Sequence, residues 1–463
     1  MNEQLITPNL EELMGKSDSE SIQNAIEYAH KIGVNSVTIP RMNQRTGEPF
    51  WSIDKAIILS SNTELILDNC YLKQKEGGYD NIFRNFADTE KGHTLAEQQR
   101  NIVVRGKGNA VLDGGAPNDL NQGTSLKNGL PHVSMNNAIL FYNIRDFVLE
   151  GFSLINQRWW GINLIHAERG RISNLYIEGN CDRPTQDGID LRVGCSNIII
   201  ENIRGQAGDD FIALSAIGNN ASPNSISSFY SVEGHSEDIH DIIIKDIIAT
   251  SVKCAMIALR NGDGRKIYNI TIENIHFMDN YTQQDGKVYP DYPTHHMGFD
   301  ISRLEKAITP YTLLRIGQDG YYKDRNNILG EVYGIHATNL HAGVGCVVMV
   351  NVSLENSYFG GIYADNDVDY ILTTKSCRAS QTYGADIRNV IFENIFMNNT
   401  DNEHATAFDL DINRENRKVE NLIVKDAFLG NCRKIFNVQC DGEVAYRNLY
   451  GKYVTKQEGI AKK

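Results

Sequence analysis

Short runs of alternating apolar and polar residues fill most of the chain from residue 36 onward. Examples are "SVTIP", "AIILSS", "TELILDN" and "NIVVRG", which are rich in β-branched residues. Alternation with a period of two is the pattern of a β-strand with one buried face, because successive side chains point to opposite sides. The pattern therefore predicts an all-β protein.

One early segment, "DSESIQNAIEYAHKIG", has the spacing of an amphipathic helix instead. Its apolar residues fall on one helical stripe: Ile22, Ala25, Ile26 and Ala29. Asp18 or Ser19 is the expected N-cap, and Gly33 follows the C-terminal end. We expect a helix over 19–32, in an N-terminal cap region at 1–40, that covers an otherwise exposed strand edge.

The strand-like runs recur with a common shape. An Asn or Asp opens each run, three or four alternating aliphatic positions follow, and then come a charged residue and another Asn or Asp. Runs of this shape begin at Asn174, Asn197, Asp241, Asn269, Asn389 and Asn421. Asn174 and Asn197 are 23 residues apart, and Asp241 follows 44 residues later, or two units of 22. Periods of this length predict a repetitive fold in which each unit packs against its neighbours.

A unit of about 22 residues accommodates three short strands and three turns, which predicts a right-handed parallel β-helix with inward Ile, Val and Leu stacked between coils. Asn and Asp suit the corners because they tolerate left-handed backbone geometry. A β-sandwich or propeller is the alternative, but blade signatures are absent and the unit is too short for four strands. We expect one β-helix domain over 1–463, with long loops lining one side at 115–136, 217–238 and 279–331.

Composition narrows the classes of partner. The net charge is −13, from 45 basic and 58 acidic residues, which argues against a nucleic-acid partner. The sequence contains no apolar stretch of about 18 residues, so it predicts no membrane span. The chain start lacks the pattern of a signal peptide, and the eight cysteines include no CxxC pair, so we expect a cytoplasmic protein with reduced thiols. A secreted protein is the alternative. The oligomeric state stays open.

Acidic residues occur where the pattern indicates buried strands. In "QAGDDFIAL", strand geometry points Asp209 and Asp210 in opposite directions. Asp187 precedes Asp209 by 22 residues, one predicted coil, so we expect it directly below the pair. Repulsion between three carboxylates this close opposes the ionisation of all three, so the pKa of one of them should rise. Glycoside hydrolysis needs this arrangement, with one carboxyl protonating the leaving oxygen and others activating water.

Other interpretations of these acids stay open. Turn acids and Ca²⁺ ligands are the alternative interpretations of four aspartates: Asp187, Asp190, Asp209 and Asp210. The histidines of "PTHHMGFD" and the acids of "YADNDVDY" also invite a metal. Adjacent histidines seldom chelate one ion, however, and a loop lining a cleft is the favoured interpretation of the first segment. We expect no metal and no cofactor.

The pair "PTQDGIDL" and, 22 residues later, "AGDDFIAL" resembles the motif pair of glycoside hydrolase family 28, the polygalacturonase and rhamnogalacturonase group. "SIQNAIEYA", "LSSNTELILDN" and "VVRGKGNAVLDGG" resemble the entry coils of these pectin-degrading β-helices, and the resemblance runs from about residue 18 to 275. It implies a pectin lyase-like β-helix with Asp209 as general acid. Asp187 and Asp210 would hold and deprotonate the attacking water, with inversion of configuration.

The sequence departs from the family at three motifs. The family's Asn-Thr-Asp is "TQD" at 185–187, and its Gly-His-Gly corresponds to "GHS" at 234–236. The resemblance implies that His235 hydrogen-bonds the acid carboxyl, with His240 as the competing candidate. The family's Arg-Ile-Lys has no clean match, and Arg260 stands at about the right place. A uronate and a neutral sugar both stay open as substrates.

"NQRWWGINL" supplies further candidates for sugar contact, about one coil before the first acid. Indole faces stack on sugar rings, so one of Trp159 and Trp160 is expected to form a subsite floor. The other should pack internally, because consecutive strand residues face opposite sides. Asn163 is a candidate for substrate binding, with a core or turn position as its alternative.

The sequence thus predicts an inverting, exo-acting glycoside hydrolase for a plant-type (pectic or related) polysaccharide or oligosaccharide. One alternative is a polysaccharide lyase or epimerase on the same fold, which would use a Lys, Arg or Tyr base and often Ca²⁺. The other is a non-catalytic β-helix that binds carbohydrate. Three stacked aspartates favour the hydrolase, since a lyase does not need them.

Overall fold

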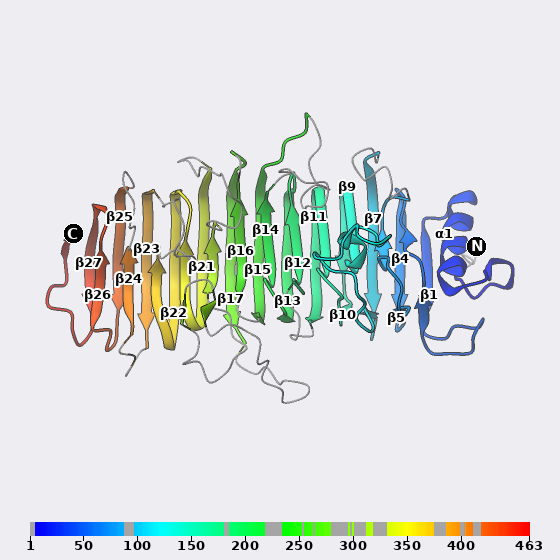
Figure 1. Ribbon diagram of the computed structural model, residues 1–463, viewed down its shortest axis with the longest axis horizontal. Coiled ribbons are helices and arrows are strands. Elements are labelled where there is room, and N and C mark those ends of the chain that lie inside the picture. The colour runs from blue at the N-terminus through cyan, green and yellow to red at the C-terminus, as the bar shows by residue number, and fades with distance from the viewer. Residues whose placement is uncertain are drawn as a thin grey trace. The chain divides into compact units, whose positions relative to one another are not determined.

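The computed structural model describes residues 5–87, 97–179, 185–217, 234–251, 254–262, 264–278, 295–296, 299–300, 312–317, 331–374, 386–398, 402, 404–410 and 418–463. The chain divides into two compact units: residues 1–207 with 218–237, and residues 208–217 with 238–463. In each unit, strands pair in parallel with strands of the next coil, which is the pairing of a parallel β-helix (Figure 1).

The first unit begins with a 3-10 helix, η1 (Glu11–Leu13), and the helix α1 (Asp18–Lys31). Another 3-10 helix, η3 (Val133–Asn136), lies in the predicted loop 115–136. The strands of this unit are β1 (Ser36–Pro40), β2 (Trp51–Ile53), β3 (Ile57–Ile58), β4 (Thr63–Asp68), β5 (Tyr71–Gln74), β6 (Phe83–Arg84), β7 (Gln99–Lys107), β8 (Val111–Asp113), β9 (Ile139–Glu150), β10 (Ser153–Ile155), β11 (Ile162–Glu178), β12 (Ile189–Arg192) and β13 (Ser196–Ala207).

In the described residues of the second unit, the regular secondary structure consists of strands alone. These strands are β14 (Ile212–Ala216), β15 (Ile239–Ser251), β16 (Ala255–Asn261), β17 (Ile267–Phe277), β18 (His295–His296), β19 (Phe299–Asp300), β20 (Thr312–Ile316), β21 (Val332–Val350), β22 (Leu354–Thr373), β23 (Ile387–Met397), β24 (Thr406–Leu410), β25 (Lys418–Phe428), β26 (Lys434–Val438), β27 (Asp441–Tyr450) and β28 (Gly459–Lys462). In the described part of this unit, the antiparallel pairs are β18 with β19 and β27 with β28.

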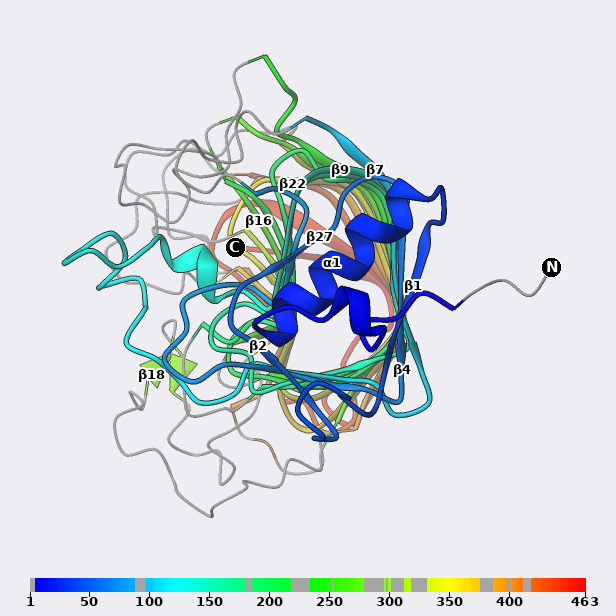
Figure 2. The same cartoon turned by 90° about the vertical axis from the view of Figure 1, so that its right-hand side faces the viewer.

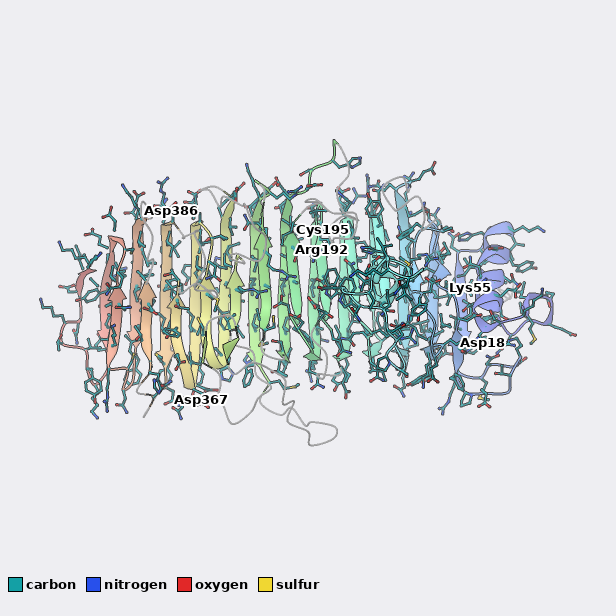
Figure 3. The ribbon with its side chains drawn as sticks, viewed as in Figure 1. Asp18, Lys55, Arg192, Cys195, Asp367 and Asp386 are labelled. Carbon is teal, nitrogen blue, oxygen red and sulfur yellow. The ribbon has the colours of Figure 1, made fainter. Side chains whose placement is uncertain are left out.

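Helix α1 covers the N-terminal end of the first unit, as predicted. Figure 1 shows it beside β1, and Figure 2, seen from that end, shows it lying across the coils. Its buried stripe contains the predicted residues Ile22, Ala25, Ile26 and Ala29. Side-chain hydrogen bonds fix it in place: Asp18 accepts from the Ser52 amide at 2.7 Å, and Gln23 accepts from the Ile58 amide at 2.9 Å. Figure 3 labels Asp18 at this end of the unit.

The N-cap is Ser17, so the prediction of Asp18 or Ser19 was wrong. Ser17 Oγ accepts the Glu20 amide at 3.3 Å, and the Glu20 carboxylate accepts the Lys16 amide at 2.6 Å in return. This pair is similar to a capping box, except that the Glu20 carboxylate binds the amide one residue before the N-cap. Ser19 Oγ instead accepts the Asp54 amide at 3.0 Å, so its side chain binds the residue that follows β2.

Asn and Asp at the coil corners take positive φ, as the repeat predicted. Each such coil has two corners five positions apart, for example Asn197 and Asn202 with φ of 54° and 52°. The side chains of equivalent corners hydrogen-bond from coil to coil: Asn202 Nδ2 donates to Asn174 Oδ1 at 2.6 Å, and Asn421 Nδ2 donates to Asn389 Oδ1 at 2.9 Å. These contacts form an Asn ladder along each unit.

The coils are less regular than the predicted 22 residues. Ile139 aligns with Ile162, a step of 23 residues, whereas Leu175 aligns with Ile203, a step of 28. In the second unit, Tyr268 aligns with Tyr333, a step of 65 residues. The prediction erred because Asn174 and Asn197 are different corners, and because turns lengthen freely where they carry no ladder contact.

Aliphatic side chains fill the inside of each coil. In the second unit Ile242, Ile270 and Ile335 align on successive coils and are buried. Burying such a side chain contributes about 1.5–3 kcal/mol, so these columns supply the main stabilisation. None of the helices that the structure describes is long and apolar enough to cross a membrane.

Replacing a corner Asn tests the ladder. Asn421→Ala should lower the free energy of unfolding by about 1–2 kcal/mol, because Ala tolerates positive φ poorly. Guanidinium unfolding followed by circular dichroism measures this change. Asp426→Asn, at the other corner of the same coil (φ 54°), retains a residue that tolerates this geometry and is the matched control. Equal stability of the Asn421→Ala variant and wild type would contradict the role of the corner.

Candidate active site

Asp209 and Asp210 lie in the turn that leads into β14, which begins at Ile212, and not within the strand as the sequence pattern indicated. Because they are in a turn, they do not point in opposite directions as strand residues would: Asp209 Oδ1 accepts the Asp210 amide at 3.0 Å. Asp209 is partly exposed, and Asp210 is fully buried. Asp210 Oδ1 accepts the Ala255 amide at 3.0 Å, which anchors the pair to β16.

Two arginines hold the inner carboxylate. Arg315 Nη2 lies 2.8 Å from Asp210 Oδ2, and Arg260 Nη1 lies 3.7 Å from the same oxygen. Arg260 Nε also donates to Ser215 Oγ at 3.0 Å, across the aligned strands β14 and β16. The structure therefore brings together the predicted residues Asp209, Asp210 and Arg260.

Cys254 lies beside the two carboxylates and, like them, has a side chain of a type that binds metal ions. Among the residues that the structure describes, its sulfur and the carboxylates of Asp209 and Asp210 form a group within 4.8 Å of one another. Burial, followed by the two carboxylates, raises the pKa of Cys254 well above its ordinary value. A thiol must ionise to bind a metal, and Arg315 already neutralises Asp210. The donor set thus favours an acid pair over a cation site.

The two carboxyls have opposite pKa shifts. Burial, and next the charge of Asp210, raise the pKa of Asp209. For Asp210, burial acts in the same upward direction, but Arg315, Arg260 and hydrogen bonds outweigh it and lower its pKa. The site can therefore keep a proton on Asp209 while Asp210 is ionised. Two carboxyls with pKa values pushed apart in this way are suited to act as acid and base.

Asp187 belongs to the first unit, where its carbonyl accepts the Gly161 amide at 2.9 Å and its side chain is buried. Asn163 aligns with Asp190 on the paired strands β11 and β12, and Asn163 Nδ2 donates to Asn137 Oδ1 at 3.1 Å. Asn163 is fully buried. The alignment of Asp187 below the acid pair stays a prediction.

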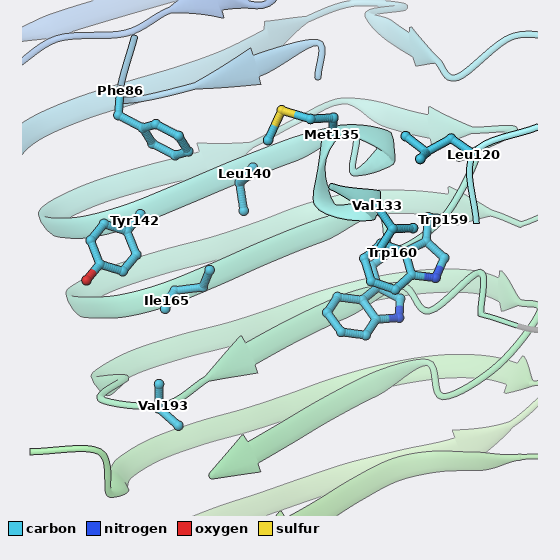
Figure 4. Close-up of a cluster of buried hydrophobic side chains, with 10 residues drawn as sticks. All are labelled: Phe86, Leu120, Val133, Met135, Leu140, Tyr142, Trp159, Trp160, Ile165 and Val193. Atoms are coloured by element: carbon cyan, nitrogen blue, oxygen red, sulfur yellow. The ribbon is translucent and has the colours of Figure 1, made fainter. Parts of the chain in front are cut away.

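Trp159 and Trp160 do not face opposite sides. They lie in a bend, and their rings stack on each other at 4.1 Å with an interplanar angle of 13°. Both are buried in a cluster with Val133, Leu140 and other apolar residues, as Figure 4 shows. The guanidinium of Arg192 lies 4.6 Å from the Trp160 ring centroid. Neither indole presents an open face for a sugar.

The two candidate histidines have different surroundings. His235, in the first unit, is exposed, and its ring centroid lies 5.8 Å from that of the buried His166. His240 stacks on Tyr268 at 4.8 Å and hydrogen-bonds the Asp241 carboxylate at 2.7 Å. His240 therefore belongs to the outer ladder of the coils.

Arg315 and Cys254 were missed by the sequence reasoning. Arg315 falls within 279–331, which was predicted as a loop, yet residues 312–316 form the buried strand β20. The apolar run "TLLRI" was the signal that could have revealed this strand. The predicted loop 217–238 lies largely outside the described residues, as do the side chains of His295 and His296.

The acidic segment "YADNDVDY" (363–370), for which a metal was considered, lies in the strand β22. Two of its carboxylates already have protein partners. Asp365 lies 3.0 Å from His341 Nε2, and Asp369 accepts a hydrogen bond from Asn402 Nδ2 at 2.9 Å. These contacts tie neighbouring coils together.

Opposite pKa shifts predict opposite effects on stability. Folding raises the pKa of Asp209. The stabilising contribution of such a carboxyl is lost as the pH rises through its pKa in the folded state. We therefore expect Asp209→Asn to raise the melting temperature near neutral pH and to change it little in acid. Asp210 has a lowered pKa and stabilises the fold above its unfolded value of about 3.9. Asp210→Asn should cost about 3–5 kcal/mol at neutral pH, because Arg315 stays buried without its counter-ion. Scanning calorimetry from acid to neutral pH measures both, and shifts of the same sign would contradict the assignment.

No protein-family model matches the chain, and no curated protein matches its sequence. Solved structures do resemble it. The hyperthermoactive exopolygalacturonase from Thermotoga maritima is 14% identical with a TM-score of 0.51, and the match covers 100% of this chain and 95% of that one. A tailspike protein variant of E. coli bacteriophage HK620, in complex with a pentasaccharide, is 12% identical with a TM-score of 0.60, over 97% of this chain and 73% of that one. These likenesses confirm the predicted right-handed parallel β-helix with an N-terminal helix.

Proposed function

We propose that the protein is an inverting glycoside hydrolase that acts on a pectic or related polysaccharide or oligosaccharide. One observation carries the proposal: a partly exposed carboxyl with a raised pKa, Asp209, lies beside a buried carboxylate with a lowered pKa, Asp210. A glycosidase needs one proton donor that faces its substrate and other carboxylates that stay ionised. The β-helix fold shared with an exopolygalacturonase supports the same chemistry.

In the proposed reaction, Asp209 gives its proton to the glycosidic oxygen while the bond from the anomeric carbon to that oxygen breaks. A water on the opposite face forms the new bond to the anomeric carbon and passes its proton to a carboxylate. Asp187 and Asp210 are assigned to this water, and His235 to the acid carboxyl. Attack from the opposite face inverts the anomeric configuration, so α-linked sugars yield β products.

Arg260 is the proposed contact for a substrate carboxylate or hydroxyl. Its side chain keeps 13% of its surface exposed beside the acid pair, whereas Arg315 is 1% exposed. A guanidinium forms paired hydrogen bonds with a carboxylate, which is the group that distinguishes a uronate from a neutral sugar. Trp159, Trp160 and Asn163 are buried, so the proposal assigns their side chains no direct contact with the sugar.

Exo-action on oligosaccharides, in the cytoplasm, is part of the proposal. The segment 115–136 supplies Leu120, Val133 and Met135 to the cluster over Leu140 and Ile165. Apolar side chains of this segment thus pack over residues of β9 and β11. Segments that pack over strands in this way favour short substrates or chain ends.

Asp209→Asn tests the hydrolase. It should lower kcat by at least about a hundredfold, because general acid catalysis contributes factors of this size. The substrates are a panel of pectic, galactosidic and rhamnosidic oligosaccharides, and proton NMR reads the anomer of the first product. Asp241→Asn is the matched control, since it exchanges the same groups at a coil corner (φ 56°) in contact with His240.

Three results would contradict the proposal. Wild-type turnover by the Asp209→Asn variant would remove Asp209 as the acid. An unsaturated product, seen by its ultraviolet absorbance, would indicate a lyase. Binding of a glycan from the panel without any turnover would indicate a carbohydrate-binding β-helix.

A further inference from the structure

Arg315 is placed to act on the acid pair from inside the protein. Its side chain is 1% exposed, and its Nη2 lies 2.8 Å from the Oδ2 of the fully buried Asp210. Arg260 approaches the same oxygen at 3.7 Å and has a side chain that is 13% exposed. The two cations therefore differ in position: Arg315 is enclosed with Asp210, and Arg260 borders the solvent.

The neighbouring coils leave room for the Arg315 side chain. Arg315 aligns with Ala258 on β16, and Ala258 aligns with Ala213 on β14. Asp210 precedes β14, so Arg315 must reach across β16, and adjacent strands lie about 4.8 Å apart. Ala258 and Ala213 are buried and pack with Ala255, and their small side chains open the path. A larger residue in this column would occupy that space.

The groups that face Asp210 come from each strand packed around it. Among the described residues, these groups are the Ala255 amide at the start of β16, Cys254 directly before it, Arg260 on β16, Arg315 on β20, and Asp209 in the same turn. Two of these groups are fixed cations, because guanidinium stays charged at all ordinary pH values. A carboxylate buried without such a partner takes up a proton instead.

We propose that Arg315 is a positioning residue whose buried guanidinium keeps Asp210 ionised, and that the Asp210 anion in turn keeps the catalytic proton on Asp209. This inference rests on the proposed function for its catalytic consequence. Without Arg315, the two carboxyls would share one proton, and neither would be the defined donor. Arg315 does not contact the sugar; it decides which of the two acids is the donor.

The first test measures stability and needs no substrate. Arg315→Met should lower the melting temperature most at neutral pH and progressively less in acid, where the unpaired Asp210 takes up a proton. The double variant Arg315→Met/Asp210→Asn removes both charges and should regain most of the loss. A loss that is independent of pH, or that adds to the loss from Asp210→Asn, would show that Arg315 serves only in packing and would overturn the inference.

The second test uses the pH profile of kcat/KM. An opposite charge within hydrogen-bonding distance moves a carboxyl pKa by about 1–3 units, so Arg315→Met should shift the acidic limb upward by about one pH unit or more. Arg315→Lys keeps a cation and should shift that limb less, in the same direction. Arg388→Met removes an arginine from an exposed ion pair with Glu420 and is the control that should leave both limbs in place. A uniform loss of rate at every pH would overturn the inference.

The two arms separate this inference from the proposed function. Rescue in the double variant together with no turnover on any glycan supports the charge coupling and contradicts the hydrolase. Loss of turnover in Asp209→Asn without any pH effect of Arg315→Met supports the hydrolase and overturns the role of Arg315. If Arg315→Met does not fold, Arg315→Lys and the double variant still decide the question.

Discussion

In most of the coils that the structure describes, the chain turns at two corners five positions apart, and the corner residues take positive φ. Asn and Asp accept that geometry at little cost, and their side chains also hydrogen-bond the equivalent corner of the next coil, as Asn202 does with Asn174. The corners lie within continuous strands, as Asn202 does in β13, and the bend at each corner fixes which side chains face inward. The buried columns, such as Ile242 with Ile270, and the outward rows both depend on this alignment.

The candidate site lies in a part of the coil whose length can vary. Turns without ladder contacts vary in length, so a turn can carry functional groups while the strands on each side stay aligned. Asp209 and Asp210 lie in such a turn, and their partners come from the strands of later coils, Arg260 from β16 and Arg315 from β20. The result is a polar cluster supported by rigid strands, which holds catalytic groups better than a loop alone.

Burial gives the cluster its chemical asymmetry. A carboxylate removed from water is costly unless a cation and hydrogen bonds compensate for it. Asp210 has this compensation, so its pKa falls, whereas Asp209 has burial and a neighbouring negative charge, so its pKa rises. The two residues are adjacent in the sequence and chemically equivalent, and the positions of two guanidinium groups, the Ala255 amide and solvent distinguish them.

The sequence by itself determined the β-helix, the helix that covers its N-terminal end, and the residues of the acid pair. These features follow from local rules: period-two alternation, recurrent Asn and Asp at corners, and one amphipathic stripe. Only the tertiary structure decided the coil lengths, the stacking and burial of Trp159 and Trp160, and the N-cap at Ser17. It also decided the pairing of Asp210 with Arg315, which are 105 residues apart. That contact is set by the alignment of strands between coils, and insertions of variable length hide this alignment from any count along the chain.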